Sequence, residues 1–145
     1  MIVEGIPREN VSMVWLDCLD WLEPALNRFP GGPDSIELFL SLLEGTRQLW
    51  IAWDEDRQKI AAAAITELVR YEGAPQNVCR VPWIGGRDID KWGRSLLSLL
   101  KAWSVDHGCR FMEGSGRRGW KKFGFSERGQ TPQGLPMLVL DLAEA

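Results

Sequence analysis

Three residues, Gly85, Gly86 and Arg87, separate a predicted strand from a predicted long helix. The strand is Val81–Ile84 and the helix is Asp88–His107. A glycine turn before a helix leaves several backbone N–H groups unpaired and pointing in one direction, and the helix dipole adds partial positive charge there. Such a turn suits a pyrophosphate group, which an arginine side chain would also bind. The same residues also fit an ordinary tight turn, because short glycine motifs give many false matches.

A second candidate for chemistry is the carboxylate of Glu67, which lies on a predicted strand, Lys59–Tyr71, near the middle of the predicted sheet. A partly buried carboxylate in a sheet can take a proton from an amine, directly or through water. The alternative is a solvated glutamate at a sheet edge. Cys79 fits a buried structural thiol better than a nucleophile, because Arg80 would point to the opposite face of the strand. The one histidine, His107, is predicted at a helix C-terminus, where a cation interacts favourably with the dipole.

Basic side chains gather around Trp120 in a predicted short helix: Arg117, Arg118, Lys121 and Lys122, joined by Arg110 and Arg128 on flanking segments. An exposed tryptophan among cations can stack on adenine or on a nucleic-acid base while the cations hold phosphate. A solvated helix face explains the same residues equally well. The formal net charge of −3 argues against general nucleic-acid binding.

The elements that position these residues follow from periodicity and turn signals. Apolar residues from Val11 to Leu22 repeat on one face of a helix that Asn10 can cap, and Asp34 begins a second helix that ends at Gly45. The predicted strands are Gln48–Trp53, Lys59–Tyr71, Asn77–Ile84, Cys109–Glu113 and Leu135–Leu142, with a further strand near the C-terminus. This order predicts a mixed α+β sheet, mostly antiparallel, with two N-terminal helices and one strand–helix–strand crossover.

The composition is that of a globular protein. At 145 residues we expect a single domain, 1–145, and 45% apolar with 26% charged residues argues against disorder. The three cysteines form no Cys-x-x-Cys pair, so no metal site is expected. Met1–Asn10 shows no signal-peptide pattern, and no apolar stretch approaches the roughly 20 residues of a membrane helix. These features predict a cytoplasmic protein without a membrane partner.

The series of strand, glycine turn, long helix, strand, short helix and Gly124-Phe125 resembles the GNAT superfamily of acyl-CoA transferases. It is similar in particular to compact members carried by bacteriophages, and the resemblance covers Val11–Leu142. It implies acetyl-CoA as cofactor, an unknown amine as acceptor, and Glu67 as general base. A strand N–H near Trp83-Ile84 would polarise the thioester carbonyl. The implied coenzyme contacts are Ile84, Gly85, Gly86, Arg87, Gly93, Arg94 and Trp120.

The chain departs from the family pattern at two places. In that family the pyrophosphate turn reads Arg or Gln, two residues, Gly, any residue, then Gly or Ala. Aligning the helices puts Gly93 at the last glycine, but Lys91 at the first glycine and Asp88 at the Arg/Gln position. Trp120 stands where the family usually has a tyrosine that gives a proton to the leaving thiolate, which an indole cannot do near neutral pH.

Three interpretations of the function remain open from the sequence. The first is an acetyl-CoA-dependent N-acetyltransferase. The second is a catalytically degenerate GNAT-fold binding module, such as a phage accessory, virion-associated or host-inhibitor protein in the host cytoplasm. The surplus of tryptophan, eight in this chain, suits a protein partner or a dimer. Nucleic-acid binding through the basic cluster is the weakest reading, because of the net negative charge.

Overall fold

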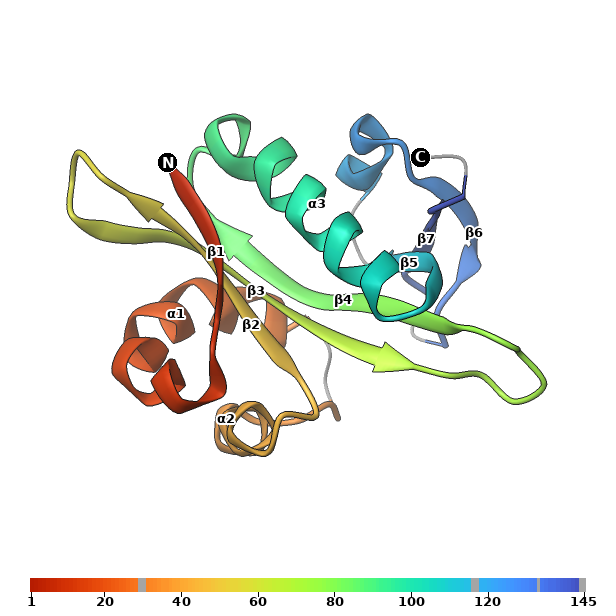
Figure 1. Ribbon diagram of the computed structural model, residues 1–145, viewed down its shortest axis with the longest axis horizontal. Helices are drawn as coiled ribbons and strands as arrows, with labels where there is room; N and C mark the ends of the chain where they lie inside the picture. The colour runs from red at the N-terminus through yellow and green to blue at the C-terminus, as the bar shows by residue number, and fades with distance from the viewer. Residues whose placement is uncertain (29–30, 116–117, 133, 144–145) are drawn as a thin grey trace. The chain divides into compact units, whose positions relative to one another are not determined.

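The computed structural model describes residues 1–28, 31–115, 118–132 and 134–143 (Figure 1). The helices and strands of the described chain are β1 Ile2–Ile6, η1 Arg8–Asn10, α1 Val11–Leu26, α2 Ser35–Glu44, β2 Gln48–Asp54, β3 Lys59–Val69, β4 Asn77–Gly86, α3 Ile89–Asp106, β5 Cys109–Ser115, η2 Arg118–Phe123, β6 Ser126–Gln130 and β7 Pro136–Asp141. The two η elements are short 3-10 helices. Among the described residues, no helix is both long and apolar enough to cross a membrane.

The strands form one 7-stranded sheet in the order β1-β2-β3-β4-β5-β7-β6. The pairs β1–β2, β2–β3, β5–β7 and β6–β7 are antiparallel. The pair β4–β5 is parallel, and α3 connects its two strands. A parallel pair needs such a crossover, because its second strand must start from the same end as the first. The predicted α+β fold, mostly antiparallel with one crossover and two helices near the N-terminus, is therefore confirmed.

Two compact units make up the chain. The first contains Met1–Thr66 and Trp83–Leu97, and the second contains Glu67–Pro82 and Ser98–Ala145. Strands β3 and β4 and helix α3 each contribute residues to both units. The expectation of a single domain over the whole chain stays a prediction.

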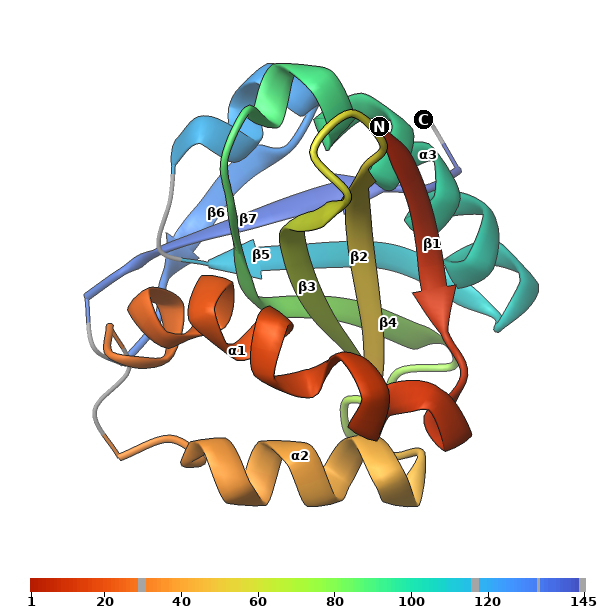
Figure 2. The same ribbon diagram turned by 90° about the vertical axis from the view of Figure 1, so that its left-hand side faces the viewer.

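In the first unit, α1 and α2 pack their apolar faces against β2 and β3 (Figure 2). Helix α1 buries Cys18 and Leu22 completely, and α2 buries Leu38. These positions follow the helical spacing in the sequence. Helix α2 begins with the expected capping box, in which the Asp34 side chain accepts a hydrogen bond from the Glu37 backbone N–H at 2.8 Å.

Strand β3 contains Ala61–Ala64, whose intrinsic preference is for helix. All four alanines are at most 1% exposed, and the strand prediction is confirmed. A continuous apolar run is typical of a strand covered on both faces, so tertiary packing outweighs the local propensity here.

Two features of the first unit differ from the sequence prediction. Strand β1, Ile2–Ile6, was not predicted, because its five residues are mostly exposed and show no regular alternation. Gly85 and Gly86 belong to the end of β4 and do not form a turn of their own. The chain turns at Arg87 and Asp88 instead, where Asp88 has a φ of 57°.

The two glycines of β4 allow other backbone segments to come close. A Cβ on Gly85 would overlap the backbone oxygen of Trp21 in α1, and one on Gly86 would lie 2.7 Å from the Ala61 backbone oxygen in β3. The Trp21 indole also donates a hydrogen bond to the Ile60 backbone oxygen at 2.9 Å. The absence of side chains at these glycines therefore positions α1 against the sheet.

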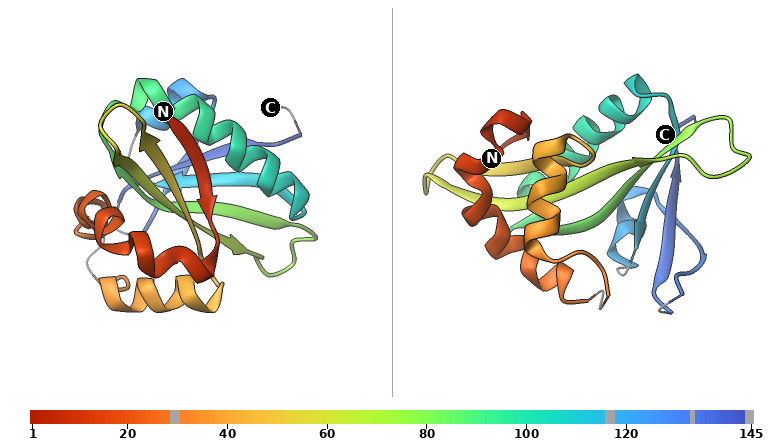
Figure 3. Two further views of the ribbon diagram at one scale, coloured as in Figure 1. Left: turned by 60° about the vertical axis from the view of Figure 1, so that its left-hand side comes forward. Right: turned by 90° about the horizontal axis from the view of Figure 1, so that it is seen from below.

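The second unit contains the parallel part of β4 and β5, the antiparallel strands β7 and β6, and the last part of α3 (Figure 3). Cys79 of β4, Met112 of β5 and Leu138 of β7 are each 0% exposed and form its core. The hydroxyl of Ser104 in α3 is buried and donates to the Leu100 backbone oxygen at 2.6 Å.

We expect Gly85→Ala to lower the free energy of unfolding by about 1–3 kcal/mol, because the new methyl group overlaps rigid backbone of α1. Chemical denaturation monitored by tryptophan fluorescence measures the change. Gly119→Ala is the matched control, since a Cβ there meets nothing within 4 Å. Equal stability of the two variants would show that α1 does not approach β4 closely.

Candidate functional site

Three charged side chains of the second unit lie on neighbouring strands of the sheet. Glu67 lies on β3, Arg80 on β4 and Glu113 on β5. In the parallel register Arg80 lies opposite Glu113, so both side chains leave the same face of the sheet. The Arg80 guanidinium contacts both carboxylates, at 3.3 Å from Glu67 Oε1 and 3.7 Å from Glu113 Oε2. The structure thus places the predicted base in a cluster with an arginine and a second carboxylate.

Tyr71 completes this polar cluster. Its hydroxyl donates a hydrogen bond to Glu113 Oε2 at 2.7 Å. Burial, followed by the hydrogen bond to Glu113, raises the pKa of Tyr71 to about 12. The phenol is therefore protonated at neutral pH and acts as a hydrogen-bond donor that fixes the orientation of the Glu113 carboxylate.

The carboxylates of the cluster are mostly shielded from water. The side chain of Glu67 is 17% exposed and that of Glu113 is 14% exposed. Among the residues that the structure describes, Glu113 Oε1 accepts no hydrogen bond, whereas Oε2 contacts both Tyr71 and Arg80. One oxygen of Glu113 is thus available to a donor from a ligand.

The β4–β5 ladder ends next to this cluster. Their parallel register runs from Asn77 with Cys109 to Val81 with Gly114 and stops there. Glu113 and its neighbours line a small hollow at this point, of about 10 Å³: Arg80, Val81, Pro82, Gly114 and Met137. A hollow of this volume holds about one water molecule. The hollow exposes backbone and side-chain groups at the end of the ladder.

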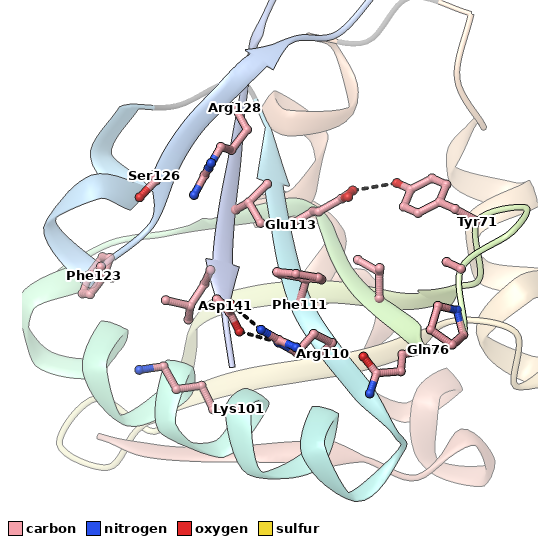
Figure 4. A pocket seen from close by; sticks show the side chains of 16 residues that line it. Tyr71, Gln76, Lys101, Arg110, Phe111, Glu113, Phe123, Ser126, Arg128 and Asp141 are labelled. Atoms are coloured by element: carbon pink, nitrogen blue, oxygen red, sulfur yellow. Dashed lines mark hydrogen bonds and ion pairs between the residues drawn. The ribbon is translucent and has the colours of Figure 1, made fainter. Parts of the chain in front are cut away.

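A larger pocket of about 780 Å³ opens on the other side of Glu113 (Figure 4). Its lining includes Tyr71 and the loop residues Ala74 and Pro75, with Phe111 of β5 and Val139 of β7. Arg110 lies at one end of the pocket and pairs with Asp141 through two hydrogen bonds, at 2.7 and 3.0 Å. Figure 4 shows Glu113 pointing toward Tyr71, with Phe111 beside it on β5. Glu113 is therefore shared by the hollow and the pocket.

The predicted phosphate contacts in the first unit have protein partners. The Arg87 guanidinium lies 2.7 Å from Asp54 Oδ2 and 2.7 Å from Asp88 Oδ2. The hydrogen bond to Asp54 raises the pKa of Arg87, and the same bond lowers the pKa of Asp54. The Arg87 backbone N–H donates to the Ala61 oxygen at 2.9 Å. Arg87 thus ties β4 to the β2–β3 hairpin, and its role toward a coenzyme stays a prediction.

The remaining predicted coenzyme contacts in the first unit differ in exposure. Ile84 is half-buried, Gly93 is buried in α3, and Arg94 is exposed on α3. Gly85 and Gly86 face α1 and β3, as described above. Trp92, between Lys91 and Gly93, is buried and donates its indole N–H to the Arg87 backbone oxygen at 2.6 Å.

The basic cluster of the second unit is partly neutralised. Trp120 is only 9% exposed, and its ring packs against Phe125 at 4.9 Å and against Gly114. The expectation of an exposed tryptophan that stacks on adenine is therefore wrong, because the ring fills the space above Gly114. Arg118 and Lys121 both pair with Glu127, at 3.2 and 3.0 Å, and lower its pKa. Arg117 lies outside the described residues.

The three cysteines are free and buried, as the sequence indicates. Burial raises the pKa of Cys79 to about 12, so its thiol is protonated at neutral pH and is not a nucleophile. Within the described residues, no group of three or more His, Cys, Asp or Glu side chains is arranged to hold a metal ion.

Sequence reasoning found Glu67 but missed Glu113 and Tyr71, and it considered Arg80 only as a neighbour of Cys79. A usable signal was present. Each of β3, β4 and β5 carries one or two charged residues within an apolar run, and such residues in neighbouring strands can meet only if the register brings them together. The register itself is not readable from the sequence, so the cluster appeared only in the structure.

Comparisons with known proteins find similarity in structure alone. No family model and no curated protein matches the sequence. An aminoglycoside 6'-acetyltransferase type Ii is similar with a TM-score of 0.72 and 15% identity, over 98% of this chain and 97% of that one. A GNAT-family acetyltransferase from Streptococcus pneumoniae has a TM-score of 0.65 and 11% identity, over 97% and 98% of the two chains.

A third similar structure is Tetrahymena GCN5, with a TM-score of 0.64 and 13% identity, over 90% of this chain and 88% of that chain. At such low identity the likeness concerns the fold and leaves the activity open. The three structures match 98%, 97% and 90% of this chain. The chain therefore has the fold of the GNAT superfamily, as its sequence led us to expect.

Proposed function

We propose that the chain is an acetyl-CoA-dependent N-acetyltransferase that acts on an amine. The observation that supports this most directly is the cluster of Glu67, Arg80, Glu113 and Tyr71 beside the end of the β4–β5 ladder. Similar structures named as acetyltransferases add support. A cytoplasmic location, the likeness to phage-borne members and a dimer stay predictions.

The residues present fit the coenzyme in two respects. The β4–β5 ladder ends at Val81 and Gly114, so the backbone groups of β4 beyond Val81 are not paired with β5 and can bind a thioester carbonyl. Lys91 and Arg94 are exposed cations on the first turns of α3, which suit phosphate groups. Acetyl-CoA supplies the acetyl group as a thioester, whose carbonyl carbon is open to attack by an amine. Of the predicted contacts we propose Ile84, Arg87, Gly93 and Arg94, because Gly85, Gly86 and Trp120 pack against the protein itself.

The carboxylates of the cluster supply the base. An amine attacks only in its neutral form, so the protein must take up a proton from the ammonium or from the attacking nitrogen. Glu67 is the base we propose, and Arg80 holds its carboxylate in place at 3.3 Å. In the reaction the carbon–sulfur bond breaks as the carbon–nitrogen bond forms. The amine proton goes to Glu67, and solvent returns a proton to the departing thiolate.

A second function, that of a binding module without catalysis, is favoured by specific residues. Arg87 is held by Asp54 and Asp88, and Asp90 adds a further negative charge in the first turn of α3. Trp120 is buried where the family usually has its acid. An anionic helix start weakens phosphate binding, so a chain of this kind would retain the fold and use its surface for a protein partner.

We expect acetyl-CoA to bind the purified protein with micromolar affinity in isothermal titration calorimetry. Arg94→Glu should weaken binding about tenfold, because it replaces a cation with an anion near the phosphates. Lys59→Glu, at an exposed position on β3, is the control and should bind as the wild type does. No binding at millimolar acetyl-CoA would favour the binding module.

We expect Glu67→Gln to lower kcat/KM for amine acetylation by about 10²–10⁴-fold, with acetyl-CoA binding unchanged, because the amide cannot accept the amine proton. Mass spectrometry of the acetylated amine gives the rate. Glu9→Gln, at an exposed position in η1, is the matched control. If Glu67→Gln acetylates at the wild-type rate, another group is the base.

Tyr71 is the only tyrosine of the chain, so its ionisation can be followed by near-ultraviolet absorbance. At pH values between 10.0, which is the ordinary pKa of tyrosine, and about 12, the wild-type phenol should stay mostly protonated. Glu113→Gln should lower the pKa of Tyr71, because it removes a charged acceptor that favours the protonated phenol. Rapid mixing to high pH records the absorbance before the protein unfolds. The same titration curve in both proteins would contradict the hydrogen bond between Tyr71 and Glu113.

A further inference from the structure

We propose that the pocket beside Glu113 takes a monoamine with an apolar, ring-sized body and discriminates against polyamines and other polycations. The inference names the class of acceptor amine and rests on the proposed function, in which the bound amine is acetylated. It depends on how charged and apolar side chains are arranged on one face of the second unit.

Residues of three strands share the face that lines the pocket. Glu113 pairs in register with Arg80 of β4 and Val139 of β7. Two residues earlier on β5, Phe111 pairs with Val78 of β4 and with Asp141 of β7. Residues two apart on a strand leave the same face and lie about 7 Å from each other. We call Arg80 and Glu113 the polar row, and Val78 and Phe111, about 7 Å away on the same two strands, the apolar row.

The polar row offers a site for one ammonium group. Glu113 Oε1 accepts no hydrogen bond within the described part of the chain, and the carboxylate is fixed by Tyr71 at 2.7 Å. Its side chain is 14% exposed, and it lines the pocket as well as the hollow at the end of the β4–β5 ladder. An ammonium bound to Glu113 thus lies next to the hollow at the end of the ladder, which suits the nitrogen that is to be acetylated.

The apolar row offers a surface for the rest of the ligand. Phe111 and Val78 lie along the strands from Glu113, Val139 lies beside it, and Ala74 and Pro75 of the β3–β4 loop also line the pocket. Burying a phenyl-sized group against such side chains stabilises binding in proportion to the apolar area removed from water. A short aliphatic link between the ammonium and a ring spans the distance of about 7 Å between the two rows.

The far end of the pocket disfavours a second positive charge. The Arg110 guanidinium lies 5.3 Å from the centre of the Phe111 ring. Asp141 is already engaged by Arg110 through two hydrogen bonds, which lower the pKa of that carboxyl. Lys101 and Arg128 also line the pocket, so its lining as a whole includes three cations and two carboxylates, Glu113 and Asp141. A polycation bound to Glu113 would bring its other ammonium groups toward these cations.

The test compares phenethylamine, ethylamine, spermidine and kanamycin, first as ligands without acetyl-CoA and then as acetyl acceptors. In calorimetry phenethylamine should bind at least about tenfold more tightly than ethylamine, because only the ring contacts the apolar row. Phe111→Ala should remove this preference, and Phe111→Leu, which keeps an apolar side chain, should retain part of it. Glu113→Gln should weaken the binding of both amines about equally, whereas Glu9→Gln should change the affinity for neither.

Acetylation assays then separate this inference from the proposed function. We expect kcat/KM to be at least about tenfold higher for phenethylamine than for spermidine or kanamycin. Higher kcat/KM for either polycation would overturn the inference and leave the acetyltransferase function intact. Binding of phenethylamine that depends on Phe111 and Glu113, without any acetylation, would support the inference and refute the function. Equal affinity for phenethylamine and ethylamine would refute the inference alone.

Discussion

The parallel pairing of β4 with β5, and its end at Val81 and Gly114, is the constraint on which the candidate site depends. While the ladder continues, the register places Arg80 against Glu113 and leaves no room between the strands. The hollow lies where the ladder ends, and Glu113, which is one residue before the last paired residue of β5, lines it. A shift of one residue in this register would send Glu113 to the opposite face and separate it from both Arg80 and Tyr71.

Much of the fold was predictable because it follows from local signals. The capping box at Asp34, the left-handed Gly45 and the apolar stripe of α3 each reflect interactions within a few residues. Strand β1 escaped prediction because a short edge strand with exposed residues carries little periodicity. Its place in the sheet depends on hydrogen bonds to β2, which no local pattern encodes.

The candidate site was less predictable, since it depends on contacts between distant segments. Glu67 was identified from its position in a strand, but its partner Arg80 is set by the sheet order. Gly85 and Gly86 were interpreted as a phosphate-binding turn, whereas the structure shows that the backbone of α1 and β3 lies close to them. A glycine indicates that something comes close to the backbone, and only the structure shows whether a ligand or the protein itself does so.

The burial of all three thiols has a practical consequence. Cys18 and Cys79 have a pKa of about 12, and burial also raises the pKa of Cys109, so the folded protein offers almost no thiolate to an electrophile. Thiol-reactive dyes should therefore leave the native chain unlabelled. A single cysteine introduced on the surface could then carry a fluorophore without removal of the native ones, and slow labelling of the buried three would report how often the fold opens.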